Sequence, residues 1–134
     1  MVDILLIDDE KNFRQSLAEG LRMYSKRLNV IAVNSGEKAL EILRTAMIDI
    51  IVTDLNMHGM DGFELLKRLQ QTHPRIPVII MSAYSQMSVD DQLKNLRYAE
   101  YIEKPLDLSA IANAILTLSQ IPSFDTSTAN HYAT

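Results

Sequence analysis

Polar side chains that could carry out chemistry stand directly after apolar runs at four places in the chain. Asp8 and Asp9 follow the first run, Asp54 follows the third, Ser82 the fourth and Lys104 the fifth. Three carboxylates that lie close together repel one another, so a site built from them needs a cation. Oxygen ligands without histidine or cysteine favour Mg²⁺ or, as a second choice, Mn²⁺. The residue types therefore predict a divalent metal site beside a hydroxyl and an ammonium group.

This set of groups suits the transfer of a phosphoryl group, which depends on positioning and on neutralisation of charge. Asp54 would be the nucleophile and would form an acyl phosphate. The metal and Lys104 would neutralise phosphoryl oxygens, while the Ser82 hydroxyl and nearby backbone N–H groups would bind the remaining ones. The pattern predicts a phosphoacceptor at Asp54.

Each segment also has an ordinary explanation when it is taken alone. Asp8 and Asp9 could be a strand end and a helix cap, and Asp54 could be a turn residue. Ser82 alone indicates almost nothing, and Lys104 could lie in solvent at the start of a helix. The prediction depends on all four segments falling at strand ends, in an order that brings them together.

The apolar runs are rich in β-branched residues, which is typical of strands buried on both faces of a parallel sheet. They span residues 4–7, 28–33, 48–52, 78–81 and 99–102. Apolar residues at helical spacing follow each run. These are Phe13, Leu17, Leu21 and Tyr24; Ala39, Leu40 and Leu43; Phe63, Leu66 and Leu69; Val89, Leu93 and Leu96; and Leu108, Ile111, Ala112, Ile115 and Leu118. Helix caps are predicted at Asp9, Ser35, Asp61 and Asp107.

Five strand–helix units in succession predict an α/β fold with a parallel sheet covered by helices on both faces. Ligands bind beyond the carboxyl ends of the strands in such a sheet, so the polar segments are expected to meet at one rim. The length of 134 residues fits one domain. We predict this domain at residues 1–119 and a polar tail or linker stub at 120–134.

Composition excludes several classes of function. The chain has no cysteine, which excludes a disulfide framework and a thiolate metal site. A net charge of −4 without a dense Lys/Arg stripe argues against direct nucleic-acid binding by this domain. The apolar runs are too short to span a bilayer and the start of the chain lacks a signal-peptide pattern. We therefore expect a cytoplasmic location and no membrane contact.

Taken together and in order, the polar segments and their flanks resemble the receiver domains of two-component response regulators, over roughly residues 2–119. The matching segments are residues 4–10, 54–57, 59–62, 77–83 and 101–105. The resemblance implies a flavodoxin-like, doubly wound sheet of five parallel strands in the order 2-1-3-4-5, with five helices. It also implies a phosphorylation switch of a two-component phosphorelay, which assists its own phosphorylation and dephosphorylation without being a conventional turnover enzyme.

The resemblance assigns a metal-binding role to four residues. Asp8 and Asp9 look like the acidic pair that holds Mg²⁺, directly or through water. Asp54 looks like the phosphoacceptor, which also contacts the metal, and Asn56 looks like the residue that lends its backbone carbonyl to it. These roles come from the family and match the chemistry that the residue types predict.

The resemblance assigns the switch to residues on the fourth and fifth strands. Ser82 looks like the hydroxyl that turns toward the phosphoryl group, and Tyr101 looks like the aromatic residue that swings inward as it does. Lys104 looks like the phosphate-binding lysine, and its bond to Pro105 is often cis in this family. Such a switch needs two states of similar free energy.

Other positions bear on lifetime and on recognition. Asn56 and Tyr84 would flank the acyl phosphate and tune access of water to it. His58 stands where the family commonly has proline, and we expect it to be an exposed loop residue. Arg97 and Tyr98 stand where Gly-Ala is common, and they are expected to alter the turn before the fifth strand and the choice of partner.

The resemblance also implies partners. The donor would be a sensor histidine kinase or a phosphotransfer protein, and the output would be a downstream protein or a linked output domain. The fourth helix, fifth strand and fifth helix would form the face that changes, and this face could also pair two copies in a homodimer.

Three alternatives compete with a phosphorylation switch. A phosphatase of the haloacid-dehalogenase type usually has a second aspartate where Asn56 stands. A flavodoxin-like FMN carrier needs a hydroxyl-rich and glycine-rich loop where Asp8 and Asp9 stand. A phosphorylation-independent binding module of receiver shape usually lacks the acceptor aspartate or the lysine, and both are present here.

Overall fold

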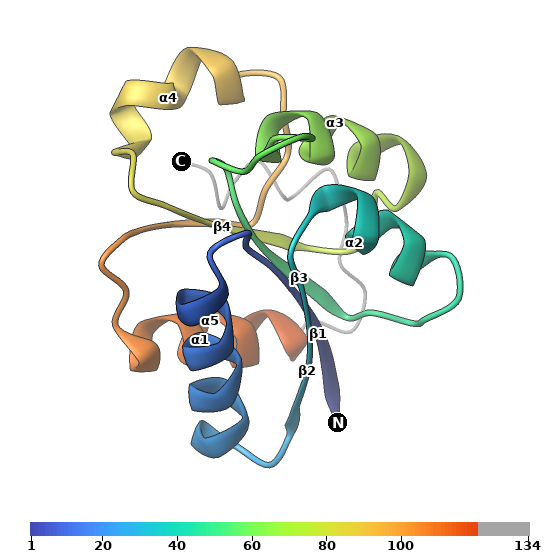
Figure 1. Ribbon diagram of the computed structural model, residues 1–134, viewed down its shortest axis with the longest axis vertical. Helices are drawn as coiled ribbons and strands as arrows, with labels where there is room; N and C mark the ends of the chain where they lie inside the picture. The colour runs from blue at the N-terminus through green and yellow to red at the C-terminus, as the bar shows by residue number, and fades with distance from the viewer. Residues whose placement is uncertain (121–134) are drawn as a thin grey trace.

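A five-stranded parallel sheet runs through the centre of the computed structural model, which describes residues 1–120 (Figure 1). The strand order is β2-β1-β3-β4-β5, which confirms the predicted fold class. The strands are β1 (Val2–Ile7), β2 (Leu28–Val33), β3 (Ile50–Asp54), β4 (Val78–Ser82) and β5 (Glu100–Glu103). The helices are α1 (Lys11–Tyr24), α2 (Gly36–Leu43), α3 (Gly62–Thr72), α4 (Gln86–Leu93) and α5 (Leu108–Ser119).

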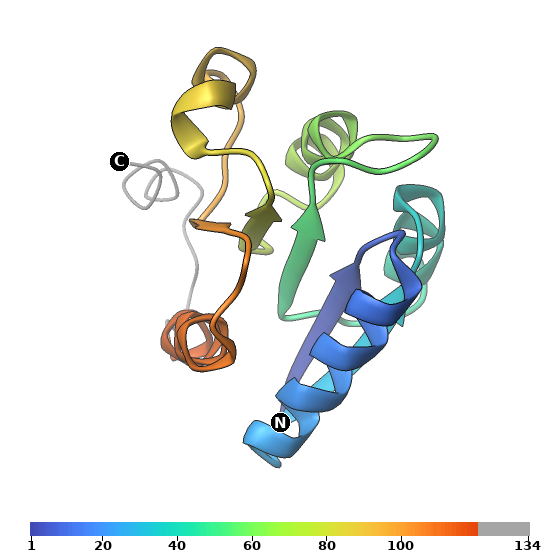
Figure 2. The same cartoon turned by 60° about the vertical axis from the view of Figure 1, so that its left-hand side comes forward.

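Two hydrophobic cores lie on opposite faces of the sheet. Helices α1 and α5 cover one face, and α2, α3 and α4 lie on the other (Figure 2). Successive residues of a strand point to opposite faces, so Ile4 and Leu6 enter the first core while Leu5 and Ile7 enter the second. All four side chains are completely buried. Burial on both faces explains why the strands read as continuous apolar runs.

Several predicted boundaries are wrong by a few residues. Strand β3 runs from Ile50 to Asp54, so the predicted end at residue 52 is too early and Asp54 belongs to the strand itself. Helix α4 ends at Leu93, and Leu96 lies in the connection to β5, where it is buried without being helical. Tyr24, the last residue of the predicted helical pattern, is confirmed as the end of α1, where it is 42% exposed.

The predicted cap of the first helix is also wrong. Glu10 caps α1, and its carboxylate accepts hydrogen bonds from the backbone N–H groups of Asn12 and Phe13. Asp9 is unavailable because it accepts hydrogen bonds from His58. The caps predicted at the other three helices are confirmed, and they are Ser35, Asp61 and Asp107.

Two further expectations concern the limits of the fold. Residue 120 forms the C-cap of α5, and the rest of the predicted tail, residues 121–134, lies outside the described residues. Within residues 1–120, none of the helices combines the length and the apolar character that crossing a membrane requires.

The loop from β3 to α3 depends on two glycines. Gly59 has a φ of 75°, a conformation that glycine adopts without steric cost. Gly62 begins α3 directly against the chain that carries Asp54. A Cβ at Gly62 would lie 2.5 Å from the Asp54 carbonyl oxygen and 2.5 Å from the Leu55 Cα. The absence of a side chain at Gly62 therefore sets how closely α3 approaches the end of β3.

Gly62→Ala is expected to lower the free energy of unfolding by about 1–3 kcal/mol, because the added methyl group meets backbone atoms that cannot turn away. Gly20→Ala is the matched control in α1. The nearest atoms to its Cβ would belong to the flexible Leu108 side chain, at 3.3 Å, and alanine favours the helix by about 1 kcal/mol. Urea denaturation of both variants checks this. Equal stability of the two variants would contradict the close approach at Gly62.

Candidate functional site

The ammonium group of Lys104 joins two carboxylates at the carboxyl ends of the strands. Its Nζ donates to Asp54 Oδ2 at 3.0 Å and to Asp8 Oδ2 at 3.1 Å. Asp54 ends β3, and Asp8 follows β1, its neighbour in the sheet. Lys104 follows β5 directly, and its peptide bond to Pro105 is cis, as the family resemblance implied. The sheet therefore brings together three of the predicted residues from distant parts of the sequence.

The charged groups that Lys104 joins are buried, and this changes their pKa values. Asp8 is completely buried, and Asp54 is 6% exposed. Burial raises the pKa of Asp8, and the charge of Asp54 adds to this effect, while hydrogen bonds from the Glu10 N–H and Lys104 oppose it. Burial alone would lower the pKa of Lys104, but its hydrogen bonds and charge interactions with Asp54 and Asp8 outweigh this, so its pKa is raised. Lys104 therefore stays charged, and a proton binds Asp8 more readily than it binds an exposed carboxyl group.

Phe13 forms one wall of the site, which the sequence analysis missed. Its ring centroid lies 4.2 Å from the Lys104 ammonium nitrogen, in a cation–π contact. Helical spacing had placed Phe13 on the core-facing stripe of its helix. Periodicity shows which face of a helix is covered, but it carries no information on a cation that arrives from residue 104.

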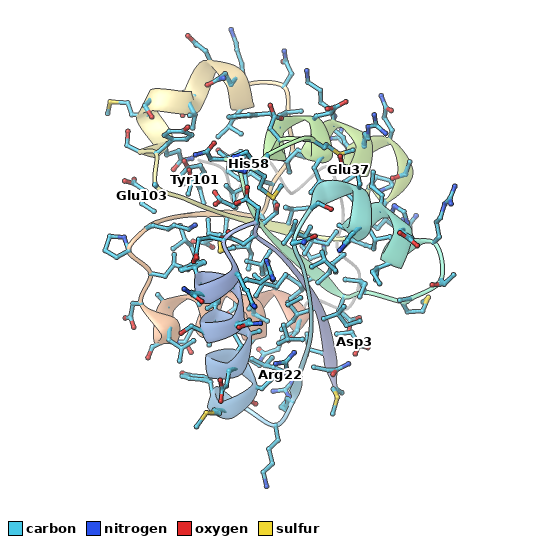
Figure 3. All side chains as sticks on the ribbon, viewed as in Figure 1. Asp3, Arg22, Glu37, His58, Tyr101 and Glu103 are labelled. Atoms are coloured by element: carbon cyan, nitrogen blue, oxygen red, sulfur yellow. The ribbon has the colours of Figure 1, made fainter. Side chains whose placement is uncertain are left out.

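Asp9 stands apart from the other two carboxylates. Its Oδ2 accepts from the backbone N–H of His58 at 2.9 Å and lies 2.7 Å from the His58 Nδ1. Partial burial would raise the pKa of Asp9, but the hydrogen bonds and charge of His58 lower it. The His58 ring is fully exposed, as expected, but its pairing with Asp9 was not predicted. His58 and Tyr101 both lie toward the end of the molecule that carries α3 and α4 (Figure 3).

Ser82, Tyr84 and Tyr101 are linked through backbone groups of Tyr84. Ser82 is completely buried at the end of β4, and its Oγ accepts from the Tyr84 N–H at 3.0 Å. The Tyr101 hydroxyl donates to the Tyr84 carbonyl at 2.8 Å. The Tyr101 side chain is only partly buried. The predicted hydroxyl and the predicted aromatic switch residue thus hold the same short loop from its two sides.

Asn56 and Tyr84 border an open groove next to the end of β3. The backbone N–H of Asn56 donates to Asp54 Oδ1 at 3.2 Å. Asn56 and Tyr84 line a groove of about 340 Å³ between the β3–α3 loop and α4, and the Tyr84 side chain is 43% exposed. Asn56 therefore contacts Asp54 directly, and Tyr84 lines the same groove as Asn56.

The charges of the site fit a divalent cation. Asp8, Asp9 and Asp54 carry three negative charges and Lys104 carries one positive charge, which leaves an excess of two negative charges. Within the described part of the chain, no three acidic, histidine or cysteine side chains converge closely enough to hold a metal ion by themselves. A cation at this site would therefore take water or backbone carbonyl oxygens as further ligands. Mg²⁺ has this preference.

Comparison with known proteins identifies relatives along most of the chain. Residues 4–116 match the family model of the response regulator receiver domain. The chain is 32% identical over 123 residues to the response regulator protein FleR of Pseudomonas aeruginosa, which covers 89% of this chain and 25% of FleR. It is 40% identical over 121 residues to the transcriptional regulatory protein ZraR of Klebsiella oxytoca, with 89% and 26% of the two chains covered. The chain thus spans about a quarter of the length of these curated relatives.

Solved structures show the same architecture. The receiver domain of the Francisella response regulator 1452 superposes with a TM-score of 0.80 at 27% identity, covering 90% of this chain and 98% of that one. The response regulator TrrA of Thermotoga maritima, in complex with Mg²⁺ and BeF, superposes with a TM-score of 0.77 at 25% identity. That match covers 88% of this chain and 99% of TrrA.

Asp8→Asn is expected to raise the melting temperature of the metal-free protein by a few degrees, the shift that about 1 kcal/mol produces in a domain of this size. An acid whose pKa is raised on folding destabilises the folded state once it is ionised. The gain should therefore vanish below pH 3.8, the ordinary pKa of the group, where Asp8 is protonated in both states.

Thermal denaturation in EDTA checks this, with Asp91→Asn on the exposed face of α4 as the control. Added Mg²⁺ should raise the melting temperature of the wild type more than that of Asp8→Asn, because the variant has lost a ligand. A variant that melts below the wild type in EDTA at neutral pH would contradict the prediction.

Proposed function

The chain belongs to the receiver domains of two-component response regulators, and from this membership we propose that it is a phosphorylation switch with Asp54 as its phosphoacceptor. The observation that carries the proposal is the contact of Lys104 with both Asp54 and the buried Asp8. Phosphoryl transfer needs a nucleophilic carboxylate, a cation that neutralises the charge developing on the phosphoryl group, and a place for a metal.

Transfer to Asp54 uses residues that lie within contact of one another. A carboxylate oxygen of Asp54 attacks the phosphorus of the donor, the bond from phosphorus to the donor breaks, and the donor leaves with that electron pair. Lys104, 3.0 Å from Asp54, shifts its hydrogen bond to a phosphoryl oxygen. Ser82 lies one residue beyond Met81, the register partner of Asp54, and its hydroxyl donates to a second phosphoryl oxygen.

Mg²⁺, or Mn²⁺ in its place, supplies neutralisation of the phosphoryl charge when it is bound. Asp8, Asp9, Asp54 and the backbone carbonyl of Asn56 would hold it, as the family resemblance implies. Both contacts of His58 with Asp9 use Oδ2, so Asp9 would serve the metal through its other carboxylate oxygen or through water. The donor in the cell would be a phosphohistidine on a sensor histidine kinase or a phosphotransfer protein.

The response to phosphorylation passes through Ser82 and Tyr101. When the Ser82 hydroxyl turns toward the phosphoryl group, the Tyr101 ring moves inward and its hydroxyl leaves the Tyr84 carbonyl. The face formed by α4, β5 and α5 changes as a result. This face would control a downstream protein or a linked output domain, and it could also mediate homodimer formation.

Incubation with acetyl phosphate and Mg²⁺ is expected to add one phosphoryl group, with none added in EDTA or to Asp54→Asn. Asp90→Asn, on the exposed side of α4, is the matched control and should behave as the wild type. Intact-mass spectrometry measures the gain. If the wild type gains nothing in any condition, the chain is a phosphorylation-independent binding module of receiver shape, and the proposal fails.

Tyr84→Ala is expected to shorten the lifetime of the acyl phosphate by roughly threefold or more, because the family resemblance places the ring beside the acyl phosphate, where it would limit access of water. The decay of the phosphorylated mass after removal of acetyl phosphate gives the rate. Tyr24→Ala removes a similarly exposed tyrosine from α1 and should leave the rate unchanged. An unchanged lifetime in Tyr84→Ala would show that Asn56 and the backbone shield the phosphate without the ring.

A further inference from the structure

Tyr98 is the most buried of the aromatic residues around α4 and β5, and its hydroxyl makes a specific hydrogen bond. The residue is only 5% exposed, although it lies two positions before β5. Its hydroxyl accepts from the side-chain Nε2 of Gln86, the first residue of α4, at 2.8 Å. This bond ties the start of α4 to the chain that enters β5.

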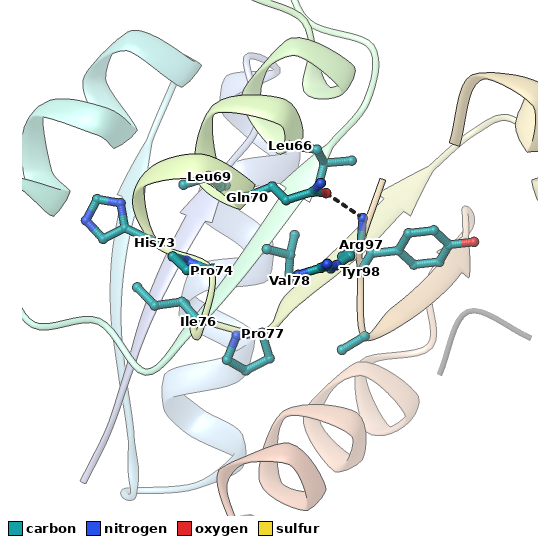
Figure 4. A pocket seen from close by; sticks show the side chains of 11 residues that line it. Leu66, Leu69, Gln70, His73, Pro74, Ile76, Pro77, Val78, Arg97 and Tyr98 are labelled. Carbon is teal, nitrogen blue, oxygen red and sulfur yellow. Dashed lines mark hydrogen bonds between the residues drawn. The ribbon is translucent and has the colours of Figure 1, made fainter. Parts of the chain in front are cut away.

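Hydrogen bonds hold the backbone on both sides of Tyr98 and so restrict the position of its ring. The neighbouring Arg97 N–H donates to the Gln70 side chain of α3 at 3.0 Å, and the Ala99 N–H donates to the Val78 carbonyl of β4 at 2.8 Å. Figure 4 shows the bond between Gln70 and Arg97 and the Tyr98 ring pointing away from the small hollow that these residues line. The hollow measures about 20 Å³, enough for a single water molecule. It therefore serves as packing around the loop and offers no room for a ligand.

Tyr98 also contacts the proposed switch residue. The rings of Tyr98 and Tyr101 pack edge to face, with centroids 6.4 Å apart and an interplanar angle of 65°. Tyr101 in turn bonds the Tyr84 carbonyl, and Ser82 bonds the Tyr84 N–H. A continuous series of contacts thus leads from the buried hydroxyl beside Asp54 to the first residue of α4.

The order of these contacts suggests what each one restrains. Turning the Ser82 hydroxyl toward a phosphoryl group releases the Tyr84 N–H, and inward movement of Tyr101 releases the Tyr84 carbonyl. Tyr84 immediately precedes Ser85, the N-cap of α4, so both releases loosen the chain that enters this helix. The bond between Gln86 and Tyr98 still holds the first turn of α4 in its resting position.

We infer that Tyr98 is a positioning residue whose hydroxyl, through Gln86, latches α4 in the resting state and opposes the change that phosphorylation produces. This inference rests on the proposed phosphorylation switch and specifies how the switch is restrained. A bond made in the resting state alone lowers the free energy of that state, and its removal shifts the equilibrium toward the active state. Phosphorylation then becomes faster, because a larger fraction of molecules already has the active arrangement.

The test compares Tyr98→Phe with Tyr24→Phe. Tyr98→Phe keeps the buried ring and removes only the hydroxyl. Tyr24→Phe removes a hydroxyl that bonds Asn113 at 3.2 Å between α1 and α5, far from the latch in the chain. Two quantities are measured for both variants and for the wild type. The first is hydrogen exchange of the α4 amides in the unphosphorylated protein. The second is the rate of phosphorylation by acetyl phosphate with Mg²⁺.

For Tyr98→Phe we expect faster exchange in α4 and about fivefold faster phosphorylation, the shift that follows from loss of one hydrogen bond between neutral groups. Tyr24→Phe should match the wild type in both measurements. Gln86→Leu removes the same bond from its other side together with a further interaction of Gln86, so adding Tyr98→Phe to Gln86→Leu should not raise the phosphorylation rate further.

A purely structural role predicts a different result for Tyr98→Phe. The melting temperature would fall, hydrogen exchange in α4 would be unchanged, and phosphorylation would be unchanged or slower. This result would overturn the inference. Failure of the wild type itself to accept a phosphoryl group would overturn the proposed function as well. In that case faster α4 exchange in Tyr98→Phe would show a helix restraint without a switch. The two failures are therefore distinguishable.

Discussion

The ammonium group of Lys104 lies between two buried carboxylates, and the folded arrangement of the site depends on that contact. Asp8 and Asp54 come together because β1 and β3 are neighbours in the sheet, and their charges repel inside the protein. Lys104 reaches them from the end of β5, which lies beyond β4 at the sheet edge. Removing Lys104 would leave the two buried carboxylates without a counter-charge, which is strongly destabilising. The strand order and the chemistry of the site are thus linked through one side chain.

The site still carries two more negative charges than positive ones, so it is poised to bind positive charge. The pKa of Asp8 is raised chiefly by burial and to a smaller extent by the charge of Asp54, so this carboxyl group gains a proton or a cation readily. Asp9 differs, since its contact with His58 keeps it ionised and outside the group around Lys104. His58, which stands where related domains commonly have proline, thus bonds one oxygen of a carboxylate that the resemblance assigns to the metal. This contact joins the β3–α3 loop to the chain that follows β1.

Much of the fold was predictable from sequence because it depends on periodic patterns. Buried parallel strands read as apolar runs, and the polar residues after them converge wherever the strands end at one edge. The errors arose where a local pattern competes with a distant partner. Asp9 has the chemistry of a helix cap but bonds His58, so Glu10 caps the helix. Phe13 packs against the core, as its spacing predicts, and its ring also contacts Lys104, which the spacing could not show.

The position of Tyr98 shows why contacts between residues distant in the sequence could not be predicted from the sequence. Where related domains commonly have small residues, this chain places a large ring whose surroundings come from α3, α4 and two strands. Its contacts with Gln86 and Tyr101 join residues that are adjacent only after folding. A small residue at this point would act as a spacer between α4 and β5, whereas a buried tyrosine with a bonded hydroxyl sets the distance and the orientation between them. A change at one position can therefore alter how readily α4 moves, while the residues that contact the phosphoryl group stay the same.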